Sequence, residues 1–337
     1  MYSMKVITTM VLRALLRQIN STLFHCRGEL FFLPPVGSIN KLIDVQIWRG
    51  KKNYMHFIII NFVSFFFFLS SLAANERPER VASLNLCTDQ LVLQLLDRDR
   101  IVSVTYLATN PVISYSAHRA IGIIKNHGLA EEVVALNPDL ILAGAFTSRP
   151  TTSLLKKLGY RVIEFEMAGS FETLRQNIIK AGEVLDEEKK AGRLVAQFNT
   201  ALGSVAPNGR LVSAIILQPN AAGAGNVSLL DDIFRSASLT SISLGQGILG
   251  IGWLTLDQVI WAQPELIISD VDPSWPSLGH FAMRHPAYRA ILDKQGRVPP
   301  RVTLPANLWN CGGPQVAKAV SILAKARAAA LDLRENR

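Results

Sequence analysis

The most distinctive side chains in this sequence are two cysteines, Cys87 and Cys311. In an oxidising compartment they would form a disulfide if their Cα atoms approached to roughly 4.4–6.8 Å, and otherwise they would remain free thiols. The sequence leaves both alternatives open. It contains no Cys-x-x-Cys, no His-x-x-x-His and no nucleophile-elbow motif, so residue spacing gives no support for metal-dependent or nucleophilic catalysis.

Two further patterns are weak signals. The Gly-rich stretch at 221–226 lacks the Gly-Lys-Ser/Thr ending of a P-loop and the spacing of a dinucleotide fingerprint, so it is interpreted as a loop on a binding face. His280 and His285 are five positions apart, a spacing that does not place them on one helical face. No metal site is predicted there.

A short pattern occurs twice, at 131–142 (EEVVALNPDLIL) and at 257–268 (DQVIWAQPELII). Each copy has an acid that opens a short helix, a proline that ends the helix, and a second acid before an apolar strand. The residue before each proline is predicted to be extended. Two copies predict two similar lobes with exposed acids, Glu131 and Asp257, at matching places. Chance similarity is the alternative, because helix–strand units share this pattern in many folds.

The elements that must position these residues alternate between strand and helix, which predicts an α/β fold with mostly parallel sheets. We expect two Rossmann-like lobes, at 79–186 and 206–335, with Thr88 as the N-cap of a helix over 90–96. Between them, 187–205 is predicted to be a connecting helix, and a helix over 187–203 would span roughly 25 Å. It is either one more helix covering a sheet or a rigid strut that joins the lobes and leaves a ligand cleft between them.

The N-terminal part of the chain predicts export. A basic flank precedes an apolar run over 57–72, and Ser71-Leu72-Ala73 fits a small-residue cleavage site, so 55–74 is predicted to be a signal peptide. A run of this length is short for a membrane span, although an uncleaved anchor is the alternative. Residues 1–54 do not fit before a signal peptide. We expect translation to begin at Met55, which N-terminal sequencing of the precursor would test.

The positive charge of the chain is concentrated at this end. The formal net charge is +9, yet residues 1–74 hold eight Lys/Arg and only two acids, and the rest holds 27 and 24. No basic stripe with interleaved aromatic residues occurs in the exported part, so nucleic acid is excluded as the main partner. The two cysteines of that part would meet an oxidising compartment.

Several segments stand in a characteristic order and spacing, although none of them is diagnostic alone. They are Arg80–Leu84, Val104–Tyr106, Glu131 with Asn137–Leu140, Leu158–Val162, Asp257 with Gln263–Leu266, and Trp309 with Gly312–Pro314. Taken in order, they resemble the periplasmic substrate-binding proteins of iron-chelate and vitamin B12 ABC importers, over about 79–335. The resemblance implies two lobes joined by one stiff helix, a ligand between them, and limited movement on binding.

The ligand site is expected where strand ends meet the cleft. Aromatic side chains there would pack a large chelate, Arg149 would pair with carboxylates, and His280 would hydrogen-bond or reach a metal. Tyr106 and Trp309 are the strongest candidates, because they occupy matched loop positions in the resemblance. The full candidate set is Cys87, Thr88, Tyr106, Phe146, Arg149, Trp253, His280 and Trp309.

The resemblance also implies a docking role for the two repeated acids. Family members use one acid on each lobe to hold arginines of the membrane permease, and by position these are Glu131 and Asp257. The shorter Asp257 departs from the more usual Glu. The alternative is that both acids only stabilise helix N-termini.

The leading hypothesis is therefore a periplasmic, monomeric, non-enzymatic carrier. It would bind an iron chelate, haem or cobalamin as its transport ligand, require no cofactor, and deliver the ligand to an ABC permease of the inner membrane. The sequence does not choose among the ligands. Two alternatives are a metal-dependent enzyme on a chelatase-like two-lobed fold, and a membrane-anchored binding or scaffold module that keeps the apolar segment at 57–72.

Overall fold

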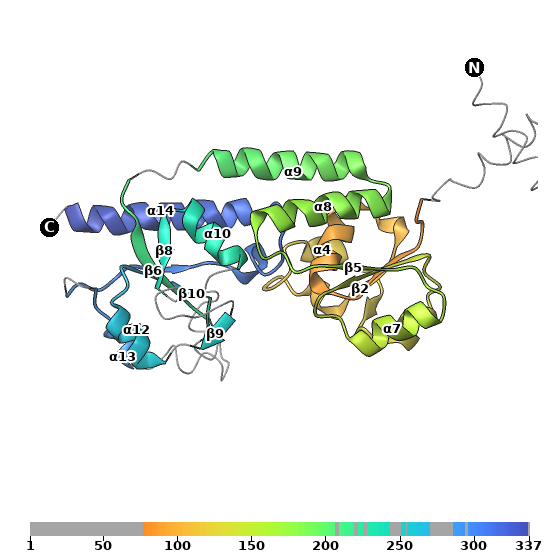
Figure 1. The fold of residues 1–337 in the computed structure, drawn as a ribbon, viewed down its shortest axis with the longest axis horizontal. Helices are drawn as coiled ribbons and strands as arrows, with labels where there is room; N and C mark the ends of the chain where they lie inside the picture. Colours follow the sequence, from red (N-terminus) through yellow and green to blue (C-terminus); the bar gives the residue numbers. More distant parts are fainter. Residues whose placement is uncertain are drawn as a thin grey trace, which may run out of the picture. The chain divides into compact units, whose positions relative to one another are not determined.

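The computed structural model describes residues 77–205, 209–218, 222–224, 228–242, 251–253, 255–269, 286–293 and 296–335. The predictions for 1–54 and for a signal peptide at 55–74 concern residues outside these ranges. Residues 76–337 form one compact unit (Figure 1). Within the described ranges, no helix combines the length and apolar character needed to cross a membrane.

The first lobe is built on a five-stranded sheet in the order β3-β2-β1-β4-β5, with every pair parallel. Its central strand β1 (Val81–Ser83) is buried along its whole length, as expected for a parallel sheet covered on both faces. The other elements are α4 (Leu86–Leu95), β2 (Ile101–Thr105), α5 (Ala117–Ala120), β3 (Lys125–Asn126), α6 (Ala130–Val134), β4 (Leu140–Gly144), α7 (Arg149–Lys157), β5 (Val162–Phe165) and α8 (Phe171–Leu185).

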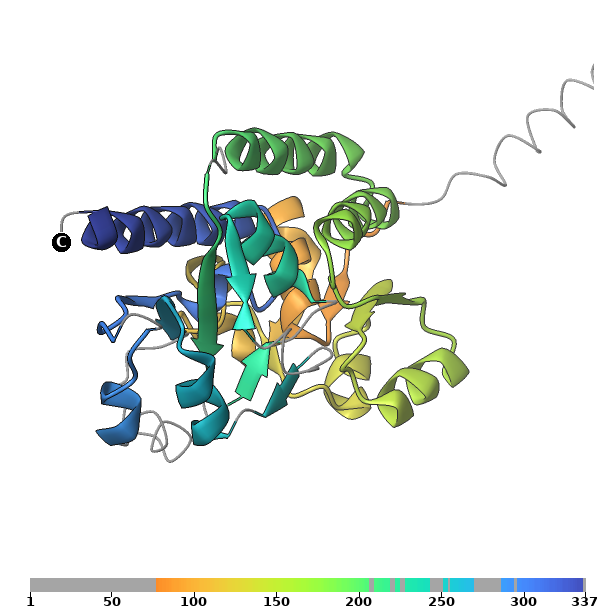
Figure 2. The ribbon, with the colours of Figure 1, turned by 60° about the vertical axis from the view of Figure 1, so that its left-hand side comes forward.

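The second lobe has a four-stranded parallel sheet in the order β11-β10-β6-β8, and a small antiparallel pair of β7 with β9. Helix α10 packs on β8 and on α14 (Figure 2). The two-lobed α/β fold is confirmed. The elements are β6 (Val212–Leu217), β7 (Ala222–Ala224), α10 (Leu229–Ser236), β8 (Leu239–Ser241), β9 (Ile251–Trp253), α12 (Leu256–Ala262), β10 (Leu266–Ser269), α13 (Pro286–Arg289), β11 (Arg301–Thr303) and α14 (Val316–Glu335).

The repeated pattern forms the same unit in both lobes. The first copy is α6 followed by β4, and the second is α12 followed by β10. Each strand lies directly beside the first strand of its lobe, β4 beside β1 and β10 beside β6. The two copies therefore occupy matching places in two similar sheets. Chance similarity of sequence gives no reason for this match, so it favours a structural repeat.

The residues before the two prolines differ from their prediction in the same way. Asn137 and Gln263 are not extended but left-handed, with φ of 46° and 48°. Gln263 is the C-cap of α12, whereas α6 ends at Val134 and Asn137 lies in the turn that follows it. Each donates its N–H three residues back, to Val134 O and Ile260 O. A left-handed residue is a common way to end a helix, and the proline disfavours the right-handed helical region rather than this one.

The acid after each proline has a structural role. Asp139 Oδ2 accepts hydrogen bonds from the N–H groups of Glu79 and Arg80, at 2.7 and 2.9 Å, just before β1. Glu265 Oε2 accepts the N–H of Ser213 at 2.8 Å, in β6. In both lobes this acid thus ties the repeated strand to the strand beside it.

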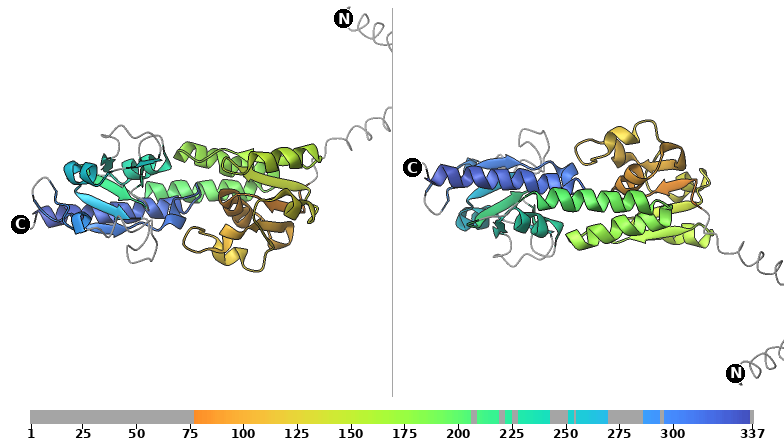
Figure 3. Two further views of the ribbon diagram at one scale, coloured as in Figure 1. Left: turned by 90° about the horizontal axis from the view of Figure 1, so that it is seen from below. Right: turned by 90° about the horizontal axis from the view of Figure 1, so that it is seen from above.

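Helix α9 (Glu188–Gly203) is the connection between the lobes and lies within the predicted 187–205. It runs between α8 and α14 and packs on both (Figure 3). Phe198 on α9 is fully buried and meets Phe171 of α8 edge to face, with ring centroids 5.3 Å apart. Helix α9 is therefore both a connection and a covering helix, since it packs against helices of both lobes.

One hydrophobic cluster extends through both lobes. It includes Val104 of the first sheet, Ile216 of the second, Phe198 of the connecting helix, and Trp309 of the segment before α14. An interface that shares its core in this way favours a fixed arrangement of the lobes over free hinge motion.

We expect the close contact of α8 with α9 to be sensitive at Gly182. A Cβ atom at Gly182 would lie 2.5 Å from Ala191 Cβ and 3.2 Å from Glu188 Cα. Gly182→Ala should therefore destabilise the protein by about 1–3 kcal/mol in urea unfolding, because two helix backbones must separate.

Gly192 on α9 provides the matched control, because an added Cβ there meets nothing within 4 Å. Gly192→Ala should stabilise the protein by about 0.5–1 kcal/mol through helix propensity alone. If both variants gained the same stability, the close contact would not constrain the packing of these helices.

Candidate ligand-binding site

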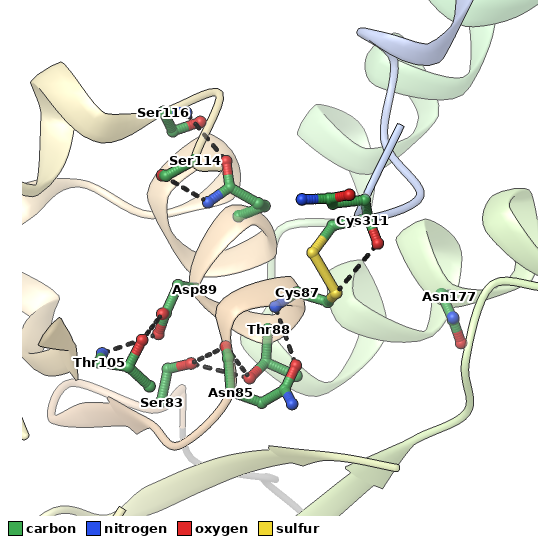
Figure 4. The surroundings of a disulfide bond; sticks show 12 residues. Ser83, Asn85, Cys87, Thr88, Asp89, Thr105, Ser114, Ser116, Asn177 and Cys311 are labelled. Carbon is green, nitrogen blue, oxygen red and sulfur yellow. Dashed lines mark hydrogen bonds between the residues drawn. A yellow bond between two sulfur atoms is a disulfide. The ribbon is translucent and has the colours of Figure 1, made fainter. Parts of the chain in front are cut away.

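A disulfide joins the two lobes at the carboxyl ends of their strands. Cys87 lies in the first turn of α4, directly after β1, and Cys311 lies after β11 and before α14 (Figure 4). Their Cα atoms are 5.0 Å apart. Of the two alternatives that the sequence left open, the structure has the disulfide. Because strand ends of both sheets meet around it, the ligand cleft of an open α/β sheet is expected at this junction.

The N-cap of α4 is Asn85, not Thr88 as predicted. Asn85 is extended, and its Oδ1 accepts the N–H of Cys87 at 2.9 Å. The helix therefore begins at Leu86, earlier than expected. Asn is as good an N-cap as Thr, so residue type alone could not decide between them.

Three further contacts hold the lobes together near the disulfide. The N–H of Phe171, the first residue of α8, donates to Asp232 Oδ2 of α10 at 2.7 Å. Asn307 Nδ2 donates to Pro111 O at 2.7 Å, and Lys318 Nζ donates to the hydroxyl of Tyr115 at 2.6 Å. Helix α8, the loop after β2 and α14 are thus tied across the junction.

Beneath the first turn of α4 lies a buried polar cluster that the sequence analysis did not identify. Asp89 is fully buried and accepts hydrogen bonds from Thr105, from N–H at 3.1 Å and from Oγ1 at 2.5 Å. Loss of solvation on burial raises the pKa of Asp89 to about 7, although these hydrogen bonds oppose the shift. A single charged residue inside an otherwise uncharged helix was the available sequence signal.

Three of the predicted ligand contacts are exposed at the carboxyl edge of the first sheet. Tyr106 follows β2 and is 50% exposed, and Phe146 follows β4 and is 79% exposed. Arg149 begins α7 and is also exposed. Strands β2 and β4 flank β1, so these side chains lie on both sides of the strand that leads to Cys87.

Two predicted contacts are corrected. Thr88 is only 1% exposed, and its hydroxyl bonds to Ser83 Oγ and to Asn85 O within the lobe. Trp309 is 8% exposed and packs in the shared core. Both side chains stabilise the interior, so they are not available to a ligand in this structure.

The remaining candidates divide into two groups. The sulfur of Cys87 is held in the disulfide, so it cannot act as a thiolate. Trp253 ends β9, where only the backbone is described, and His280 lies outside the described residues. The contribution of the second lobe to the ligand site therefore remains a prediction.

Two residues that sequence reasoning missed lie beside Tyr106. The ring of His127, just after β3, stacks on Tyr106 with centroids 5.1 Å apart and an interplanar angle of 24°. Glu132 of α6 accepts both the N–H of His127 at 2.6 Å and its ring Nδ1–H at 2.9 Å. Hydrogen bonds from the main chain and then the ring of His127 lower the pKa of Glu132.

The two predicted docking acids occupy equivalent positions. Glu131 is the second residue of α6, Asp257 is the second residue of α12, and both are exposed. A hydrogen bond from the Thr255 hydroxyl lowers the pKa of Asp257, so this carboxylate stays ionised. The geometry is compatible with a docking pair and with helix N-terminal stabilisation.

Residues 81–242 match the family model described as periplasmic binding protein. This part of the chain, which is nearly half of its length, is therefore similar to periplasmic binding proteins. The match includes the five strands of the first sheet, the connecting helix α9 and the first strands of the second lobe.

Known relatives extend this finding. The chain is 26% identical over 137 residues to a cobalamin-binding protein of Halobacterium salinarum, covering 41% of this chain and 37% of that protein. It is 26% identical over 141 residues to an uncharacterized ABC transporter substrate-binding lipoprotein of Bacillus subtilis, covering 41% and 44%. The chain thus spans less than half the length of these relatives.

The whole two-lobed architecture has solved counterparts. The periplasmic heme-binding protein RhuT from Roseiflexus sp. RS-1 superimposes with a TM-score of 0.62 at 20% identity, over 75% of this chain and 98% of that one. At this identity the similarity establishes the fold alone, including that of the second lobe.

The buried Asp89 should make stability depend on pH. Its carboxyl stays protonated in the folded state up to about pH 7, whereas it ionises near its usual pKa of 3.8 when unfolded. The folded state therefore binds more protons between these values, and the free energy of unfolding should fall as pH rises, by roughly 1.4 kcal/mol per pH unit over part of the range.

This pH dependence should be smaller in Asp89→Asn, measured by urea unfolding at several pH values. Asp97→Asn, at an exposed position after α4, is the control and should keep the wild-type slope. An unchanged slope in Asp89→Asn would assign the pH dependence to other groups.

Proposed function

We propose that this protein is the solute-binding component of an ABC importer, which captures a metal chelate or corrinoid outside the inner membrane and delivers it to the permease. The observation that carries the proposal is the junction of the lobes. The Cys87–Cys311 disulfide joins segments that follow a strand of each parallel sheet, and the exposed Tyr106 and Phe146 follow the two strands that flank β1. A site of this kind suits a large, partly apolar ligand.

The comparisons support a carrier and bring no support for an enzyme. Similar proteins carry the descriptions cobalamin-binding, heme-binding and ABC transporter substrate-binding. The shared core and the ties across the junction also fit a carrier that presents one surface to its partner, because a fixed body keeps Glu131 and Asp257 at a constant separation. The apolar segment at 57–72 supports export to the periplasm as a signal peptide.

Ligand binding tests the proposal directly. Tryptophan fluorescence of the exported protein should be quenched saturably by at least one of haem, cobalamin and ferric siderophores, since four tryptophans lie after residue 74. Free N-acetyltryptophanamide titrated in parallel controls for absorption of light by the ligand. Absence of saturable binding for all of them would refute a carrier of these chelates.

The docking role is tested by reversing both charges. Glu131→Arg combined with Asp257→Arg should reduce uptake into cells to background while leaving ligand affinity unchanged, because both acids are exposed and face no described cation. Loss of one first-turn acid costs about 0.3–1 kcal/mol, which a folded lobe tolerates.

The matched control reverses two other exposed acids, Glu166→Arg with Glu183→Arg, and should retain uptake. Normal uptake by the Glu131 and Asp257 double variant would rule out docking through these residues. Loss of its ligand affinity would instead show that the repeated acids serve the architecture of the lobes.

A further inference from the structure

Tyr106 and His127 form an exposed aromatic surface that the neighbouring strands hold in place. The side chain of His127 is 61% exposed, that of Tyr106 is 50% exposed, and the two rings stack with each other. Both residues directly follow paired strands, because Thr105 of β2 is the register partner of Asn126 of β3. The pair therefore stands at the carboxyl edge of the first sheet, the edge that leads to the disulfide.

The backbone on either side of His127 is held by buried groups. Asn126 is 1% exposed, and its Nδ2 donates to Ser83 O at 2.9 Å and to Ser103 Oγ at 3.0 Å. Its Oδ1 accepts the N–H of Gly128 at 3.1 Å. One buried amide thus anchors the loop to β1 and β2, so His127 projects from a fixed support.

Glu132 determines which nitrogen of His127 is available. A carboxylate can only accept, so Nδ1 must carry the proton that it donates to Glu132 Oε1 at 2.9 Å. In the neutral imidazole the lone pair is then on Nε2, and no described residue hydrogen-bonds that atom. A carboxylate that fixes the tautomer and orients the ring is the arrangement that typically supports a histidine bound to a metal.

The described residues offer no cluster of three or more His, Cys, Asp or Glu side chains that could hold a metal ion. A single imidazole supplies only one ligand to a metal ion. A metal bound here must therefore arrive with its other coordination positions already filled by a chelating molecule. Imidazole nitrogen suits iron and cobalt centres of intermediate softness. The chemistry points to a chelate with one open coordination position.

We propose that Nε2 of His127 coordinates the metal of the transported chelate at an open axial position, with Tyr106 packing beside the macrocycle. The inference rests on the proposed carrier function and narrows its ligand class. Planar macrocycles such as ferric haem and aquacobalamin have an axial position that imidazole can occupy. A hexadentate ferric trihydroxamate has no open position and is excluded from this contact.

Titration of the exported protein with ferric haem, aquacobalamin and a ferric trihydroxamate tests the proposal by absorption spectroscopy. One of the two macrocycles should bind and acquire the spectrum of a nitrogen-ligated metal. His127→Ala should abolish that spectrum and weaken binding about 10–100-fold. Added imidazole should restore the spectrum in His127→Ala, which also shows that the variant is folded.

Three variants separate coordination from packing. Glu132→Ala should keep the nitrogen-ligated spectrum and weaken binding, because Glu132 only positions the ring. Tyr106→Phe should keep the spectrum, since stacking is retained and the phenol is not the ligand. His118→Ala, at an exposed histidine of α5 in the same lobe, should behave as wild type.

The outcomes distinguish this inference from the proposed function. A macrocycle spectrum unchanged in His127→Ala, or lost instead in Tyr106→Phe, would overturn coordination by His127 and leave the carrier intact. Tight binding of the ferric trihydroxamate alone would overturn the ligand class but not the carrier. Binding of none of the three would overturn the inference together with this form of the proposed function.

Discussion

The arrangement of the two lobes depends on how their strand ends are joined. The Cys87–Cys311 disulfide is a covalent link between residues that are far apart in sequence, and it joins the first turn of α4, which follows β1, to the segment between β11 and α14. Two nearby hydrogen bonds reinforce this link. Asp232 of α10 accepts the N–H of Phe171 at the start of α8, and Lys318 of α14 donates to the hydroxyl of Tyr115. Linking residues 224 positions apart closes a long loop and removes chain entropy from the unfolded state, so this one bond stabilises the folded junction.

The same region shows why polar residues are distributed as they are. Beneath the junction, Asp89, Thr88 and Ser83 are buried and satisfied by hydrogen bonds within the first lobe. Above it, the aromatic and basic side chains remain exposed. A buried polar group needs a hydrogen-bond partner within the protein, whereas a side chain on a ligand surface finds its partner when the ligand binds. The chain passes from buried polar residues to exposed aromatic and basic residues within a few positions after a strand.

The repeat shows how one local pattern builds two sheets. In each copy a left-handed residue and the proline after it separate the helix from the strand that follows, and the acid after the proline holds the neighbouring strand through main-chain N–H groups. The opening acids Glu131 and Asp257 remain exposed, which frees them for a role outside the lobe. Architecture and the proposed docking therefore use different acids of the same pattern.

By itself, the sequence determined the two-lobed α/β fold, the repeated unit and the connecting helix, because hydrophobic periodicity, prolines and caps act locally. Only the tertiary structure decided which side chains are available. It buried Thr88 and Trp309, paired Cys87 with Cys311, and placed His127 on Tyr106 with Glu132 behind it. These outcomes depend on contacts between distant segments and on the pairing of β2 with β3, for which local residue spacing carries no signal.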